Sequence, residues 1–317
     1  MSNENIKIEG HLLALSPIAH NGNEKSGNTV TLRRIYMITA EGKRKNIPYL
    51  EGNAVRGMLR RLLMGDFFHQ LKIPAHTLNP RVYHMFFTGG NLEQVSKGQG
   101  EIDIQLRQKM AELLPPIAVL GTSYLNQAIP GNLIVSKMYP ICKELQHFYP
   151  LYGIKENEYP QFNVEQLTSE SFQTRRDDRK VQTVNSKNPM QMKIETEVFI
   201  PGTNFMHYFI LSNLTKVELS MFHHLMHLWK QKPVFGGKSA IGNGQMELNY
   251  DLSKLPSSDL YFKFVQDNRT KILALITEIE NEGINRTQKR PKKTSAAKPT
   301  KNKIKADQKI AASILEK

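Results

Sequence analysis

Cysteine is almost absent from this chain of 317 residues, which contains Cys142 alone. A single cysteine excludes a disulfide within the chain and a zinc site built from cysteines. This usage is typical of a reducing compartment, so we expect a cytoplasmic protein. Long apolar runs are missing as well, and the opening residues MSNENIKIEG lack the hydrophobic region of a signal peptide. We therefore expect no membrane partner.

Signals for nucleotide or metal binding are also lacking. The glycine-rich segment FGGKSAIGNGQ is not a P-loop, because the first glycine of the Walker A pattern is missing upstream of Lys238. His223, His224 and His227 share one predicted helix, but a metalloprotease pattern needs a glutamate where His224 stands. We expect neither a cofactor nor a bound metal, and we interpret these histidines as packing or surface residues.

Positive charge is the strongest compositional feature, with a formal net charge of +14. Residues 286–317 hold 11 Lys and Arg against Asp307 and Glu316, a net charge of +9, which leaves only +5 for the first 285 residues. The tail from residue 285 has too few apolar residues to fold and is predicted to be disordered. Because the rest of the chain is only mildly basic, a nucleic-acid path there must be a local groove.

The stretch from Ile47 to Leu71 predicts an extended segment followed by a helix. Apolar residues recur on one helical face at Val55, Leu59, Leu62 and Leu63. Asn53 occupies the expected N-cap position, where its side chain accepts a backbone N–H of the first turn. The start of the helix carries three arginines, Arg56, Arg60 and Arg61. Arginines near the positive end of a helix predict an anion site, with phosphate as the obvious ligand.

The helical periodicity separates these arginines into two groups. Arg56 and Arg60 are four residues apart and share a face, so we expect them to contact phosphates and to matter little for stability. Arg61 points about 100° away from Arg60, and we expect it to be structural or to contact another subunit. An alternative interpretation is an ordinary amphipathic helix whose arginines are merely solvated.

The remaining pattern predicts an α+β fold. A first strand spans residues 6–14, a second helix begins at the capping box of Thr215 and Glu218, and a last strand spans residues 246–250. Alternation over residues 194–200 and 205–211 around Pro201-Gly202 predicts a hairpin. With insertions at about 72–130 and 142–193 removed, the order is βαββαβ, the ferredoxin-like or RRM-type arrangement. We expect one domain over residues 1–284, followed by the basic tail 285–317.

Five segments in this order resemble the RAMP superfamily: IPYLEGNAVRGMLRRLL, VLGTSYLNQAIPGNLIVSKMYP, TRRDDRK, IETEVFIPGTNF and FGGKSAIGNGQMEL. The resemblance is to the backbone subunit of class 1 CRISPR effector complexes, and it is nearest to type IV. It implies a palm of the RRM type, a helical insertion and a thumb hairpin.

The resemblance also implies an RNA-binding site. Its residues lie on the predicted first helix, in the TRRDDRK segment, in the glycine-rich loop and in the loop after the first strand. They are Asn53, Arg56, Arg60, Arg61, Arg175, Arg176, Arg179, Lys180, Lys238, Ser239, Asn243 and His20. An alternative interpretation of the TRRDDRK cluster is a solvated loop whose basic residues pair with Asp177 and Asp178.

The expected function is a non-catalytic subunit that polymerises along a CRISPR guide RNA. Its partners would be that guide, a complementary DNA or RNA target strand, further copies in a head-to-tail filament and other CRISPR effector subunits. The loop Ser16–Thr31 contains His20 and Glu24 but not the aspartate that target-cutting relatives carry. Two alternatives stay open: a ribonuclease that processes guide RNA or cuts target RNA, and a basic RNA-binding domain outside CRISPR systems, which would bind RNA as a monomer.

Overall fold

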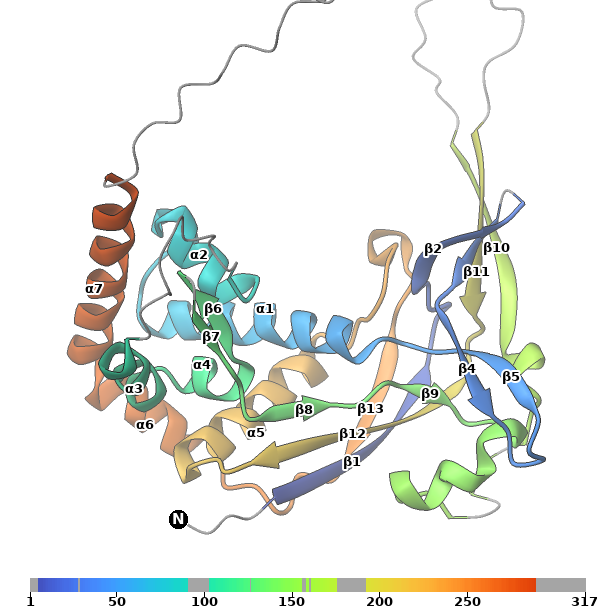
Figure 1. Ribbon diagram of the computed structural model, residues 1–317. Helices are drawn as coiled ribbons and strands as arrows, with labels where there is room; N and C mark the ends of the chain where they lie inside the picture. The colour runs from blue at the N-terminus through green and yellow to red at the C-terminus, as the bar shows by residue number, and fades with distance from the viewer. Residues whose placement is uncertain are drawn as a thin grey trace, which may run out of the picture. The chain divides into compact units, whose positions relative to one another are not determined.

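The computed structural model describes residues 5–27, 29–90, 103–125, 127–155, 158–159, 161–175 and 192–288. Its main sheet is antiparallel and has the strand order β13-β1-β12-β8, with β9 also pairing with β12 (Figure 1). The strands are β1 (Asn5–Ala14), β8 (Leu133–Val135), β9 (Tyr139–Pro140), β12 (Asn204–Ser212) and β13 (Met246–Tyr250). Met1–Glu280 form one compact unit that contains this sheet.

Two helices, α1 (Gly52–Gln70) and α5 (Lys216–Gln231), lie side by side over one face of the sheet (Figure 1). Ile8 and Leu12 of β1 alternate inward toward them, because successive strand residues point to opposite faces. The predicted capping box is present, since Thr215 and Glu218 exchange backbone and side-chain hydrogen bonds of 2.6 and 3.3 Å. Strand order and connectivity together give the predicted ferredoxin-like βαββαβ palm.

A second sheet of order β10-β11-β3-β2 corrects two sequence predictions. Its strands are β2 (Asn21–Ser26), β3 (Thr29–Leu32), β10 (Thr168–Arg175) and β11 (Met192–Phe199). Residues 16–31, expected to be a loop, thus supply two strands. The hairpin predicted around Pro201-Gly202 is wrong: β11 pairs with β10 and β3, whereas β12 pairs with β1.

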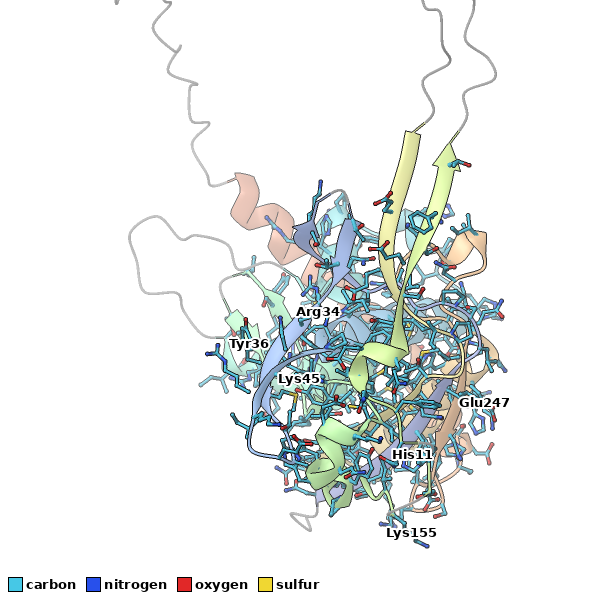
Figure 2. All side chains as sticks on the ribbon, turned by 90° about the vertical axis from the view of Figure 1, so that its right-hand side faces the viewer. His11, Arg34, Tyr36, Lys45, Lys155 and Glu247 are labelled. Atoms are coloured by element: carbon cyan, nitrogen blue, oxygen red, sulfur yellow. The ribbon has the colours of Figure 1, made fainter. Side chains whose placement is uncertain are left out.

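The chain changes sheets at this turn because backbone groups near β1 hold it there. Gly202 N–H donates to Ala14 O over 2.7 Å, and Ala14 N–H donates to Thr203 O over 2.9 Å. Alternation along two segments fits strands in different sheets as well as it fits a hairpin. Strands β10 and β11 pair with each other from Thr168 and Phe199 to Arg175 and Met192, and Glu195 and Thr196 of β11 pair with β3 (Figures 1 and 2). The TRRDDRK segment, which the resemblance assigns to the thumb, begins at the end of β10.

The predicted insertion at about 72–130 packs into the main core. It contains η1 (Ala75–Thr77), α2 (Pro80–Phe87), α3 (Ile104–Leu113), α4 (Pro115–Leu120), β6 (Thr122–Tyr124) and β7 (Gln127–Ile129). Phe86, Met110 and Ile117 are buried in the same cluster as β1 and α5. The Pro115-Pro116 pair follows α3 and begins α4, because proline suits a first helical turn whose N–H groups are unpaired anyway.

A smaller core lies against the other side of the palm. It is built by β4 (Arg34–Ile38), β5 (Arg44–Pro48), η2 (Lys143–Tyr152) and η3 (Val164–Leu167). Lys45, labelled in Figure 2, ties β5 to η2 through a 2.6 Å ion pair with Glu144. The C-terminal region forms α6 (Asp259–Asp267) and α7 (Arg269–Gln288). The helix α7 therefore continues four residues into the predicted tail 285–317, and residues 289–317 lie outside the described residues. Within the described part of the chain, no helix has the length and apolarity needed to cross a bilayer.

Candidate nucleic-acid interface

Two loops from opposite ends of the chain form the floor of a cleft. The glycine-rich loop, which holds η4 (Ser239–Ile241), runs along the segment after β1. Gly237 N–H donates to Ala19 O over 2.7 Å, and Gly244 N–H donates to Pro17 O over 2.9 Å. Gly236 has φ +90°, and a Cβ there would lie 2.5 Å from Ala19 O. Glycine is therefore required for the two backbones to meet.

The start of α1 forms the next wall, and its cap differs from the prediction. The helix begins at Gly52 with Glu51 as its N-cap, so Asn53 lies within the first turn and is exposed. The N–H of Glu51 donates to Nε2 of His20 over 3.1 Å. Burial and, to a smaller extent, the nearby Arg33 together lower the pKa of His20 to about 4, so the imidazole is neutral at pH 7 and can accept this bond.

The carboxylate of Glu51 is fully engaged beside this cap. It accepts hydrogen bonds from Lys137 Nζ at 2.7 Å and from the Tyr49 hydroxyl at 3.0 Å. Burial acts to raise the pKa of Glu51, but these two donors outweigh burial and hold its pKa below the usual value. Glu51 is therefore a paired anion, which reduces its repulsion of a phosphate at the helix start.

The cleft itself has a volume of about 740 Å³. It lies between the segment after β1, α1 and the loop from α5 to β13, and its lining is Ala19, His20, Asn21, Ala54, Met58, Arg61, Leu62, Lys232, Val234, Phe235, Gly236, Gly237 and Ser239. Arg61 and Lys232 are both exposed. Neither forms an ion pair with a carboxylate of the described residues. The lining contains two cations and no carboxylate, which suits a polyanion.

Arg56 and Arg60, which were predicted to share a face of the helix and to contact phosphates, do not line this cleft. Arg56 donates to the carbonyl oxygens of Leu133 and Leu120, each over 2.6 Å. Arg60 is 7% exposed and donates to Gly121 O at 2.7 Å and Leu120 O at 2.9 Å. The two guanidinium groups thus cap the C-terminal end of α4, where carbonyl groups lack helical partners.

The predicted residues of the glycine-rich loop are divided between several roles. Ser239 lines the cleft. Lys238 has left-handed backbone angles and directs Nζ to the Thr196 hydroxyl of β11 at 2.5 Å. Burial lowers the pKa of Lys238. Asn243 is buried beneath the loop, and its Nδ2 has no hydrogen-bond partner among the described residues.

The predicted basic cluster of the TRRDDRK segment begins where β10 ends. Arg176, Arg179 and Lys180 lie outside the described residues, as does the side chain of Arg175 at the end of β10. Lys232 and Met58, by contrast, were missed by the sequence analysis although both line the cleft. Helical spacing from Ala54 through Met58 to Leu62 was the available signal for this second face of α1. Lys232 follows α5 directly, and nothing in its sequence context marked it.

The histidines of α5 contact one another and α6. His223 Nδ1 lies 3.0 Å from the Ser258 hydroxyl, and Nε2 of His223 lies 3.4 Å from Nε2 of His227. His224 pairs with Asp66 at 3.0 Å. In the part of the chain that the structure describes, no three His, Cys, Asp or Glu side chains are grouped as metal ligands.

Comparisons with known proteins agree with the sequence resemblance. The family model of the RAMP superfamily matches residues 11–247. A solved structure described as "Type IV-B CRISPR Complex" contains a chain of the same fold, with a TM-score of 0.55, 22% sequence identity and coverage of 80% of this chain and 96% of that chain. At this identity the likeness shows the fold alone. No curated protein sequence matches the chain.

Proposed function

The chain belongs to the RAMP superfamily, and we propose that it is an RNA-binding subunit of a CRISPR ribonucleoprotein complex. The family match covers the end of β1 and the segment after it, α1, α5 and the glycine-rich loop, which together build the cleft. The fold that it shares with a chain of a Type IV-B CRISPR complex supports the same assignment. The chain's partners in this proposal are a CRISPR guide RNA and other subunits of the effector complex.

The cleft with Arg61 and Lys232 is the observation that carries the proposal. Its two unpaired cations lie beside a glycine-rich backbone that a phosphate can approach closely. Single-stranded RNA is held by basic grooves of this kind, which follow the sugar-phosphate backbone and leave the bases free. Ser239 and the exposed Asn53 add hydrogen-bonding groups near the path.

The other predicted residues take different parts in this proposal. Arg56 and Arg60 support α1 and α4 from within, so they affect RNA binding by shaping the cleft. Lys238 fixes the glycine-rich loop to β11, and His20 fixes the segment after β1 to the start of α1. The TRRDDRK segment, with Arg175, Arg176, Arg179 and Lys180, supplies further contacts to RNA or to an adjacent subunit.

We further propose that several copies assemble head to tail along one guide, as a non-catalytic backbone. A contact between different faces of successive copies grows a filament rather than a closed ring. The guide would then pair with a complementary DNA or RNA strand, and base pairing rather than side chains would read sequence. The proton-transfer groups nearest the cleft are already engaged: His20 accepts from Glu51 N–H, and the Glu51 carboxylate is paired with Lys137.

The proposal is tested by mixing the chain with single-stranded RNAs of increasing length and counting bound copies by native mass spectrometry. A backbone subunit adds copies in regular steps as the RNA lengthens. One copy at every length would contradict the backbone role and favour a monomeric RNA-binding domain. Absence of binding at any length would overturn the RNA-binding assignment itself. An Arg61→Ala/Lys232→Ala double variant serves as the control for the binding site, because it removes the two cations of the cleft and leaves the buried arginines unchanged.

A further inference from the structure

A second groove lies between α1 and α2, on a face of α1 next to the face that lines the cleft. It has a volume of about 330 Å³, and its lining residues are Asn53, Arg56, Gly57, Arg60, Arg61, Tyr83, Phe87 and Thr88. The lining contains no carboxylate. Two of its walls are chemically different: α1 offers polar and cationic groups, and α2 offers the rings of Tyr83 and Phe87.

The aromatic wall is the end of a stack that begins in the core. The ring of buried Phe68 is stacked on Phe87, with centroids 5.8 Å apart and planes 20° apart. Phe87 is stacked in turn on Tyr83, at 4.6 Å and 15°. Tyr83 is 39% exposed and ends the stack at the groove. A stack anchored in the core holds its outermost ring in a fixed orientation, which favours addition of another flat ring.

The available cation in this groove is Arg61. Arg56 and Arg60 line the groove too, but their guanidinium groups are bonded to carbonyl oxygens of residues 120, 121 and 133. At 100° per residue, Arg61 falls between the face of Gly57 and the face of Ala54 and Met58. It therefore lines both the groove and the cleft. A strand held in the cleft by its phosphates passes within reach of the aromatic wall.

We propose that the groove between α1 and α2 binds one unpaired nucleotide of a single strand, with its base stacked on Tyr83 and its phosphate paired with Arg61. Stacking on aromatic side chains is the usual way in which proteins hold unpaired bases irrespective of sequence. Gly57 leaves the α1 wall open, because a Cβ there would meet only Arg61 Nη1, at 3.7 Å. The site shares Arg61 with the cleft and so rests on the proposed nucleic-acid function.

The test uses the full chain and a single-stranded RNA carrying 2-aminopurine, whose fluorescence falls when the base is stacked. Tyr83→Leu should weaken binding by about 5- to 150-fold and abolish the quenching, because base stacking on an aromatic ring is worth that much. Tyr83→Phe should keep both, since the hydroxyl is not needed. Gly57→Leu should also abolish the quenching by filling the groove while leaving Tyr83 and Arg61 in place.

Matched controls separate the groove from general damage to the protein. Gly65→Leu adds the same side chain to α1 at an exposed glycine with no atom within 4 Å of its added Cβ. Phe262→Leu removes a ring of α6 that is 39% exposed, as Tyr83 is. Both should behave as the unaltered chain. Suppose that the unaltered chain binds RNA, and that Tyr83→Leu and Gly57→Leu bind it with the same affinity and the same loss of 2-aminopurine fluorescence. The nucleotide site is then refuted and the proposed function stands. If the unaltered chain binds no RNA, both are refuted.

Discussion

Arg56 and Arg60 donate to the same acceptor, the carbonyl oxygen of Leu120, over 2.6 and 2.9 Å. Two side chains one turn apart on α1 thus converge on the end of α4, 60 residues away in sequence. Burial lowers the pKa of both guanidinium groups, and burial together with the proximity of Arg56 lowers that of Arg60 to about 10. Bringing two desolvated cations together is unfavourable by itself. The hydrogen bonds to otherwise unpaired carbonyl groups offset that cost.

Arg60→Ala should destabilise the fold by about 1–3 kcal/mol, because it leaves the buried carbonyl oxygen of Gly121 without its Arg60 donor and that of Leu120 with Arg56 as its remaining side-chain donor. Arg61→Ala should change the free energy of unfolding by no more than about 0.5 kcal/mol, since its side chain is exposed. Chemical denaturation of the two variants provides the comparison. Equal stabilities would show that the Arg60 contacts contribute nothing to the fold.

Arg61→Ala and Lys232→Ala should each weaken RNA binding about equally for all sequences. Each lost phosphate contact with a single strand should reduce the slope of log affinity against log salt by about 0.7. Affinities measured between low and high salt give the slope. Lys230→Ala, on the last turn of α5 and absent from the cleft lining, is the matched control. A slope unchanged in the Arg61→Ala/Lys232→Ala variant would place the RNA path elsewhere.

The fold should lose stability as the pH falls from about 6.5 to 4. Burial lowers the pKa of His20 to about 4 and that of His207 to about 3, so the unfolded chain binds more protons than the folded chain across this interval. The free energy of unfolding therefore decreases with decreasing pH. His20→Gln should give a shallower dependence, because glutamine still offers an acceptor to Glu51 N–H but does not titrate.

Denaturation of both proteins at several pH values measures this difference. Glu51 and Glu144, whose pKa values are held below the usual value, add to the same trend in each protein, so the comparison isolates His20. His69→Gln, at an exposed position of α1, is the control substitution. Parallel curves for His20→Gln and the unaltered chain would contradict the assigned protonation of His20.

The assembled complex should leave a guide-complementary RNA intact in the presence of Mg²⁺. The segment after β1 lacks the aspartate expected of a target-cutting relative, and a general base must be both positioned and able to take a proton. Gel analysis of labelled RNA gives the result. A regular ladder of cuts that disappears in His20→Ala or Glu24→Ala would instead establish the ribonuclease alternative.

A chain that ends at Gln288 should fold and still assemble on guide RNA. It keeps every described helix and strand, and it removes residues 289–317 with their net charge of +8. Non-specific binding to polyanions should weaken and depend less on salt, because fewer counterions are released. A full-length chain whose tail lysines are replaced by glutamine separates the effect of charge from that of length. Failure of the shortened chain to fold would show that the tail is needed for the fold.

Much of the palm could be predicted from local patterns. The helix containing Val55 and Leu59, the capping box at Thr215 and the strands 6–14 and 246–250 each carry their own signal. Those signals depend on neighbours within a few residues, which is the range over which periodicity and capping act. Pairing of β11 is different, because alternation shows that a segment is a strand but not which strand lies beside it. Hydrogen bonds between residues 14–18 and residues 199–203 determine which strands lie beside β11.

The sequence by itself determined that this chain is a basic α+β protein of the RAMP superfamily with an arginine-rich first helix. Only the tertiary structure decided what each arginine does. Helical spacing placed Arg60 and Arg61 about 100° apart, but it could not show that α4 ends opposite Arg60 while a cleft opens beside Arg61. The N–H groups of a guanidinium can donate to carbonyl oxygens as well as to phosphate. The groups that packing brings within hydrogen-bond distance therefore select its role.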